Sequence, residues 1–306
     1  SFISNLSALL PGTIYHVRAY ATNVAGTAYG NDIPFTATPI AVPTLTTTVI
    51  TSVTLTTAIS GGTISADGGS AIIARGVCWA ITANPIITNS KTSDATGIGS
   101  FISNLSALLP GTIYHVRAYA TNLAGTAYGN DIPFTTNPII VPTLTTVAVT
   151  SITYTTSVSG GNISSDGGGT ISAKGVCWAT SANPTIASSK TTDGTGIASF
   201  VSTLTALTPG TAYHVRAYAT NSAGTAYGSD VTFTSNPIVV PSLTTTAVTL
   251  ITTTSAASGG NVTNNGGGVI SARGVCWATT TGPTRTDFRT TEGRGTGRFP
   301  IRLNGW

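Results

Sequence analysis

Apolar and polar residues alternate along residues 212–221, which read Ala-Tyr-His-Val-Arg-Ala-Tyr-Ala-Thr-Asn. A period of two places successive side chains on opposite faces of a β-strand. The apolar set is Tyr213, Val215, Ala217 and Ala219, and the polar set is His214, Arg216, Tyr218 and Thr220. The pattern therefore predicts a strand over 212–221 that turns one face toward a hydrophobic core.

Other stretches rich in β-branched residues flank this strand and are separated by clusters of glycine, proline and aspartate. They predict strands over 143–149, 152–158, 171–179, 198–204 and 224–234. Ser159-Gly160-Gly161 and Asp166-Gly167-Gly168 are typical of turns. Six or seven short strands within about a hundred residues are typical of a β-sandwich.

The predicted strand over 171–179 has one face of small residues and one face with larger ones. Gly175 and Cys177 lie on the small face, and Val176 and Trp178 lie on the other. Because the small face fits the alanines of the neighbouring strand, we expect Cys177 in the core and Trp178 outside.

This placement predicts an outer stripe of aromatic and basic side chains in each copy of the pattern. The stripe fits either cross-strand packing with cations over aromatic rings, or contact with a neighbouring domain, a partner or a glycan. Its members are Trp79, Trp178, Trp277, Arg18, Tyr20, Arg117, Tyr119, Arg216 and Tyr218.

The whole pattern repeats with a period of 99 residues, so Ser1-Phe2 returns as Ser100-Phe101. Residues 1–35 and 100–134 differ only at Val24 and Leu123. A period of this length is a whole small domain, and the chain is predicted to be a tandem array. The expected modules are the last strands of a sandwich over 1–37, complete sandwiches over 43–136 and 142–235, and a sandwich lacking its last strands over 241–306.

Composition agrees with an all-β array of sandwiches. Methionine is absent, charged residues make up 7% of the chain, and threonine, valine and isoleucine favour strands. The net charge of +4 comes from only 13 lysines and arginines in 306 residues, which is too sparse to follow a phosphate backbone. We therefore expect no nucleic-acid partner, and no apolar run is long enough to predict a membrane span.

The sequence offers no constellation that would support catalysis, a cofactor or a metal. Each repeat carries a single cysteine (Cys78, Cys177 and Cys276), and these are expected to be buried thiols rather than disulfide partners. Asp67-Gly68-Gly69 does not predict a Ca²⁺ site, because the third copy has Asn265 in place of the carboxylate. We expect the protein not to be an enzyme.

Residues 204–224 contain a Pro209-Gly210 turn followed by Tyr213, the position of a tyrosine corner whose hydroxyl bonds back to the turn. This segment resembles the region around the E–F corner of fibronectin type III domains. The chain also resembles the Gly-Val-Cys-Trp repeats of secreted surface proteins of Bacteroidota. It departs from fibronectin domains in its Cys-Trp pair and in lacking the tryptophan usual on their second strand. The resemblance implies a bacterial, extracellular structural or adhesive module without catalytic residues.

The junctions between the predicted modules are short and apolar. Two prolines bracket Ile40-Ala41-Val42, Ile139-Ile140-Val141 and Ile238-Val239-Val240. Such segments favour an extended backbone, which predicts a stiff rod.

The partial modules over 1–37 and 241–306 complement each other, and two explanations stay open. The array continues covalently, or one copy completes another head to tail by strand donation, which makes an open filament. The expected function is a structural segment of an extracellular filament or rod. The alternative is an adhesin stalk or a module that binds a glycan or another partner at the cell surface.

Overall fold

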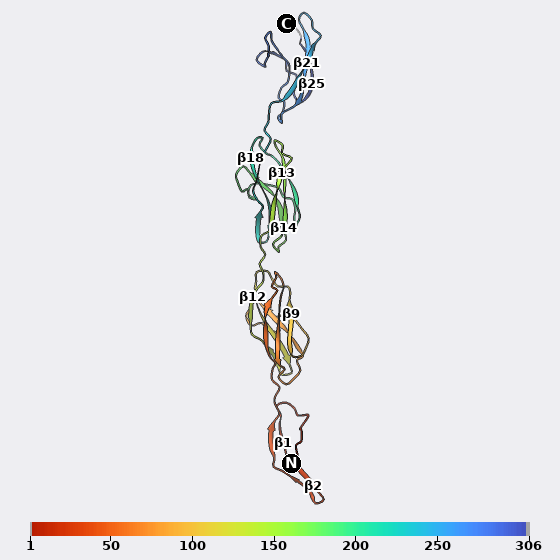
Figure 1. Ribbon diagram of the computed structural model, residues 1–306, viewed down its shortest axis with the longest axis vertical. Coiled ribbons are helices and arrows are strands. Elements are labelled where there is room, and N and C mark those ends of the chain that lie inside the picture. The colour runs from red at the N-terminus through yellow and green to blue at the C-terminus, as the bar shows by residue number, and fades with distance from the viewer. Residues whose placement is uncertain (1, 304–306) are drawn as a thin grey trace. The chain divides into compact units, whose positions relative to one another are not determined.

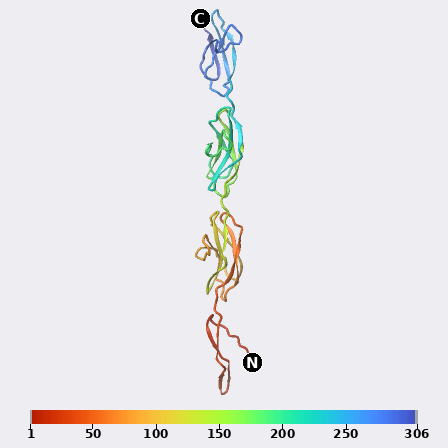
Figure 2. The same cartoon turned by 90° about the vertical axis from the view of Figure 1, so that its left-hand side faces the viewer.

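The computed structural model describes residues 2–303 and contains strands but no helix in that range. Figures 1 and 2 show these strands and their connecting loops in two views. No helix among the described residues could cross a membrane. The chain forms two compact units that divide between Ile139 and Ile140. The predicted all-β class is confirmed.

The first unit contains a complete two-sheet sandwich. One sheet has three antiparallel strands in the order β5 (Thr44–Thr51), β6 (Ala58–Ala66) and β9 (Gly99–Leu105). The other contains β11 (Gly125–Tyr128), β10 (Ile113–Asn122), β7 (Ala74–Ala80) and β8 (Ser90–Lys91), with β12 (Ile132–Thr135) beside β10. The core lies between the sheets and includes Ile64, Val77 and Val116, each at most 2% exposed.

The second unit contains the same sandwich. Its first sheet is β13 (Thr143–Thr150), β14 (Ser157–Ser165) and β17 (Phe200–Leu204). Its second sheet is β16 (Ser189–Lys190), β15 (Ala173–Ala179), β18 (Ala212–Asn221) and β19 (Gly224–Tyr227), with β20 (Val231–Thr234) beside β18. Figure 1 labels β13, β14 and β18 in this sandwich. The predicted strand over 212–221 is confirmed, and its buried face carries Tyr213, Val215, Ala217 and Ala219.

The predicted strand over 152–158 is wrong, because β14 begins at Ser157 and runs through the expected turn at Gly160-Gly161. These glycines are needed for close packing rather than for a turn. A Cβ on Gly160 would lie 2.0 Å from the carbonyl oxygen of Phe200, and one on Gly161 would lie 2.7 Å from the Cβ of Ala217. The predicted strand over 224–234 is divided into β19 and β20.

The remaining strands form smaller sheets in each unit. In residues 2–37 they are the pair β1 (Ile14–Val17) with β4 (Ile33–Thr36) and the pair β2 (Tyr20–Asn23) with β3 (Gly26–Tyr29). In residues 241–303 they are the sheet β21 (Ser242–Thr249), β22 (Ala256–Asn264) and β25 (Gly297–Leu303), and the pair β23 (Cys276–Trp277) with β24 (Phe288–Arg289). The last three residues of the predicted module over 241–306 lie outside the described residues.

The expected orientation of Cys177 and Trp178 is wrong. Trp178 lies opposite Val215 in the β15–β18 register, is 8% exposed and belongs to the core. Cys177 lies on the opposite face, where it is fully buried beneath Pro184. The small residues face a covering loop, because a Cβ on Gly175 would lie 2.4 Å from the carbonyl oxygen of Thr191.

Candidate contact surface

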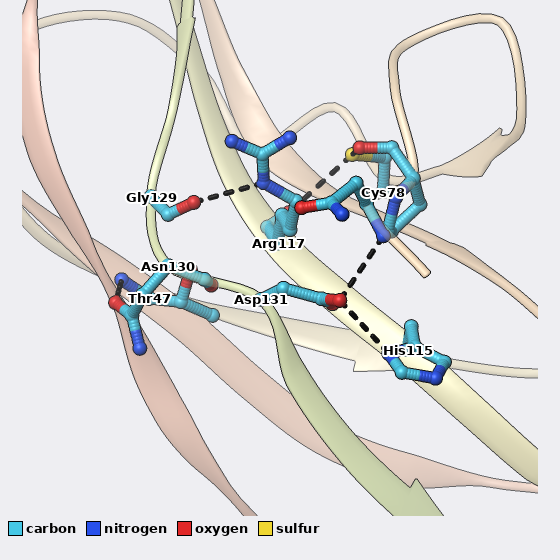
Figure 3. Close-up of polar contacts among 9 residues, drawn as sticks. Thr47, Cys78, His115, Arg117, Gly129, Asn130 and Asp131 are labelled. Carbon is cyan, nitrogen blue, oxygen red and sulfur yellow. Dashed lines mark hydrogen bonds and ion pairs between the residues drawn. The ribbon is translucent and has the colours of Figure 1, made fainter. Parts of the chain in front are cut away.

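The outer face of the β7–β10 sheet, on the side away from the core, carries Arg117 (Figure 3) and Tyr119 of the predicted stripe. Cys78 lies opposite Arg117 in the strand register, and His115 and Tyr119 follow on the same side of β10. We call this side the outer face. Strand alternation alone places these four side chains together.

A loop over residues 81–89 covers the outer face, and two of its backbone N–H groups are held by side chains of the sheet. The carboxylate of Asp131 accepts through Oδ2 from the backbone N–H of Asn84 at 3.0 Å and from Nδ1 of His115 at 2.9 Å. The hydroxyl of Tyr128 accepts from the backbone N–H of Ile87 at 3.1 Å. Figure 3 shows Asp131 and His115 directed toward each other. The closed loop therefore depends on polar side chains of the β10–β11–β12 region.

The loop buries the thiol of Cys78 completely. Its Sγ–H donates to the carbonyl of Pro85 at 3.3 Å. Burial raises the pKa of Cys78 from 9.0 to about 11, although the nearby positive charge of Arg117 acts in the opposite direction. A thiolate is the reactive form of cysteine, so this thiol is unreactive in the closed structure. The expectation of buried thiols is confirmed for Cys78 and Cys177, and Cys276 is partly exposed.

Arg117 is held by groups of its own sandwich. Its Nε donates to the carbonyl of Gly129 at 2.9 Å, and its guanidinium lies 4.8 Å from the centre of the Tyr128 ring. Beside it, Asn130 accepts from Thr47, and Thr47 Oγ1 accepts from the backbone N–H of Ala118. These bonds fasten β5 of the first sheet to β10 of the second.

The second complete sandwich reproduces this arrangement with nearly the same distances. Asp230 accepts from the N–H of Asn183 and from His214, each at 2.9 Å, and Arg216 donates to Gly228 at 2.9 Å. The pKa of Cys177 is likewise raised by burial to about 11.

Residues 14–32 form two of the same interactions, and both partners of each interaction lie within this segment. His16 and Asp32 pair at 2.8 Å, and Arg18 donates to Gly30 at 3.0 Å. The side chains of His16 and Asp32 are 61% and 52% exposed, against 23% and 19% for His115 and Asp131. The histidine–aspartate pair therefore forms without a covering loop.

The structure separates the tryptophans of the predicted stripe from its arginines and tyrosines. Trp178 lies in the core of the second sandwich and Trp79 packs against the core of the first, whereas Arg117 and Arg216 are on the outer faces. Tyr119 and Tyr218 are 4% and 3% exposed and donate to the carbonyls of Thr92 and Thr191; Tyr20 is 68% exposed. Contact of the stripe with a partner stays a prediction.

Sequence reasoning did not identify the aspartates that hold the loops closed. A small polar residue and an aspartate directly precede β4, β12 and β20, as Asn31-Asp32, Asn130-Asp131 and Ser229-Asp230. The signal that could have identified these aspartates is that they recur every 99 residues. Among residues 2–303, no group of three or more histidines, cysteines, aspartates or glutamates could hold a metal ion.

The junction preceding each complete sandwich is also attached to that sandwich. Asn122, 3% exposed, donates through Nδ2 to the carbonyls of Ala41 and Asp67, both at 2.7 Å. The N–H of Ala41 in turn donates to Gly68 at 2.9 Å. In the second unit, Asn221 donates to Ile140 and Asp166, and Ile140 donates to Gly167.

The tyrosine corner predicted at Tyr213 is confirmed, because its hydroxyl accepts from the backbone N–H of Thr208 at 3.0 Å. The same bond joins Tyr114 to Leu109 at 3.1 Å and Tyr15 to Leu10 at 2.8 Å. Gly210 adopts the expected positive φ of 64° in the preceding turn.

Neither a family model nor a curated protein matches the sequence. Among solved structures, the crystal structure of the FN1–FN3 domains of chicken CNTN1 is similar at 15% sequence identity, with a TM-score of 0.28. The match covers 74% of this chain and 79% of that chain.

Proposed function

We propose that the chain is a structural, non-catalytic segment of an extracellular filament or rod, built from β-sandwich modules over 1–37, 43–136, 142–235 and 241–306. Its partners are further copies of the same modules, either in one longer chain or in separate chains joined by strand complementation.

The observation that carries this proposal is the short stretch of unattached chain between the two complete sandwiches. Asn137 is bound to the first unit, since its N–H and side-chain amide donate to Thr54 and Val53. Ile140 is bound to the second unit through Gly167 and Asn221. Only two residues separate these anchored positions, and the first of them is a proline. A joint of this length restricts the motion of one module against the next.

In the complete sandwiches, polar side chains of the outer face form hydrogen bonds within their own module. The outer-face arginines, histidines and buried tyrosines bond to loops of the same module. Such use supports a structural role over the adhesin alternative, which needs side chains free to contact a glycan.

The test is negative-stain electron microscopy of the full chain together with a glycan-binding screen. We expect segments with a narrow distribution of angles at the junctions and no glycan binding. A matched pair of variants inserts four glycines after Ile139, at the junction, or after Gly97, in an exposed loop. Only the first should broaden the angles. Freely variable angles in the unmodified chain, or specific glycan binding, would overturn the proposal.

A further inference from the structure

The three-stranded sheet of each complete sandwich is built without a charged residue. In the first sandwich, β5, β6 and β9 contain no lysine, arginine, histidine, aspartate or glutamate, and β13, β14 and β17 contain none in the second. The charged residues of both sandwiches lie in the other sheet or in the loops. A sheet of this kind meets no like-charge repulsion when it approaches a second copy of itself.

Strand β9 forms one edge of this sheet in the first sandwich. Among residues 2–303 it pairs only with β6, and its seven residues keep a register without a bulge. Its outward side chains include Ser100, Ile102 and Asn104, and Ile102 is 75% exposed. In the second sandwich β17 lies in the same way beside β14, and Val201 is 75% exposed. A regular, uncharged edge with an exposed apolar side chain readily accepts another strand.

The other edges of the first sandwich have features that hinder such pairing. β5 has two irregularities in its register with β6, and the backbone N–H of Thr47 already donates to Asn130. β8 has two residues, one of them Lys91, and β11 and β12 have four residues each. Short, bulged or charged edges pair poorly with a second chain. Within residues 43–136, all of which the structure describes, β9 is therefore the one long edge without such protection.

The equivalent strand β25 carries protective residues at the same positions. Pro300 has the place in the β22–β25 register that Ile102 has in the β6–β9 register. Arg298 stands where β9 has Ser100, and the side chains of Arg298 and Pro300 are exposed. A proline is tolerated in a strand where its nitrogen faces away from the neighbouring strand. The N–H of Ile102 therefore faces the free edge of β9, where a second strand can accept it.

We propose that β9 of one chain pairs antiparallel with β9 of a second copy of this chain. Backbone hydrogen bonds along the two edges join the three-stranded sheets into one continuous sheet. This inference goes beyond the filament function proposed above, because it joins chains side by side rather than end to end. β17 offers the same kind of edge in the second sandwich, so each chain has two such sites and association continues beyond a pair.

The joint is isologous, which means that the same surface contributes both sides. In the two-fold register that centres on Ile102, this residue lies opposite its own equivalent and Ser100 lies opposite Asn104. The register brings the two exposed isoleucine side chains together and places small polar side chains on either side of them. The apolar contact then lies at the centre of the paired strands.

Sedimentation of the full chain tests the association. We expect the average mass of the unmodified chain to rise with concentration. The double variant Ile102→Pro with Val201→Pro copies the residue of β25 and should abolish the rise, while urea unfolding shows that both sandwiches remain folded. The matched variant Val49→Lys changes a residue that is 68% exposed on the bulged β5 edge, and it should leave the rise unchanged.

A second double variant, Ile102→Lys with Val201→Lys, keeps the test independent of how well the fold tolerates proline. Both residues are exposed, so the lysines have room in the single chain. In the paired strands they would place like charges directly opposite each other, which is destabilising. We expect this variant to stay monomeric at concentrations where the unmodified chain associates.

Disulfide cross-linking tests the register of the joint. Residues directly opposite each other in a hydrogen-bonded antiparallel pair have Cα atoms about 5.5 Å apart, within the range of a disulfide. With Cys276→Ser as the background, we expect mild oxidation to give cross-linked dimers of Ile102→Cys. The matched variant Thr63→Cys, exposed on the central strand β6, should give only a small fraction of that yield.

Three results would overturn the inference. They are a chain that stays monomeric at every concentration, a rise in mass that survives both double variants, and equal cross-linking of Ile102→Cys and Thr63→Cys. None of these measurements depends on the junction angles within a single chain, so the rod proposal is tested separately.

Discussion

The side-chain amide of Asn122 lies 2.7 Å from the carbonyl oxygen of Ala41, although 81 positions separate the two residues in the sequence. Through this bond the last hairpin of a sandwich holds the linker that precedes its first strand. The same Nδ2 group also binds Asp67, so one buried side chain fixes the linker and the neighbouring turn together.

Replacement of Asn122 by alanine should loosen this linker. The substitution leaves two carbonyl groups without their donor, and removal of one partner from a buried hydrogen bond costs about 1–3 kcal/mol. We expect that loss in the free energy of unfolding of the first sandwich, and faster hydrogen exchange at the N–H of Ala41. The matched variant Asn23→Ala changes an exposed residue and should alter stability by less than about 0.5 kcal/mol.

Gly129 and Gly30 occupy the same repeat position in different surroundings. A Cβ on Gly129 would lie 2.5 Å from Oγ1 of Thr47, whereas one on Gly30 meets atoms only at 3.6 Å or more. We expect Gly129→Ala to destabilise the first sandwich by about 1–3 kcal/mol in urea unfolding, because overpacking displaces the backbone. Gly30→Ala should leave stability unchanged, because a Cβ at Gly30 has room. Equal stability losses would contradict this account.

Loss of the carboxylate of Asp131 should expose Cys78. The Asp131→Ala variant lacks the acceptor that holds the N–H of Asn84, and a bond to a charged group contributes about 1.5–3 kcal/mol. We therefore expect Cys78 to react with a thiol reagent roughly 10–100 times faster, the rate that such a free-energy change produces. Mass spectrometry of the labelled protein provides an internal control, because Cys177 should react as slowly as before.

Alkaline pH should destabilise both complete sandwiches. Their buried thiols have a pKa of about 11 in the folded chain, against an ordinary value of 9.0. The folded state thus favours the protonated thiol. This preference stabilises the fold fully below pH 9, and the stabilisation is lost as the pH rises through about 11. The loss amounts to at most about 2–3 kcal/mol for each thiol.

Urea unfolding across this pH range measures the effect. The Cys78→Ala variant should show a smaller decline for the first sandwich than the unmodified chain. A decline of the same size in both proteins would assign the pH dependence to other groups.

Strand positions were largely predictable from the sequence because alternation reports directly on which residues share a face. The strand over 212–221 was therefore located correctly, as was the tyrosine corner at Tyr213. Alternation does not report which face is the core. Gly175 and Cys177 are small because the chain near Thr191 and Pro184 passes over them, and that loop leaves no periodic signal in the sequence.

The attachment between sandwich and linker also escaped prediction, for a related reason. Asn122 lies at the end of an alternating strand and is followed by a turn, where asparagine is common for local reasons. Its bond to Ala41 joins segments at opposite ends of the repeat, and only the folded structure brings them together.

Counted from linker to linker, each complete copy contains both the asparagine and the backbone groups that it holds. A copy that is added or removed as a whole therefore contains both partners of the hydrogen bonds that hold its linker. No compensating change is needed in the other copies. The near identity of residues 1–35 and 100–134 is what duplication of a whole module leaves in the amino-acid sequence. The length of the protein can thus change in steps of one module during evolution, while the construction of every junction stays the same.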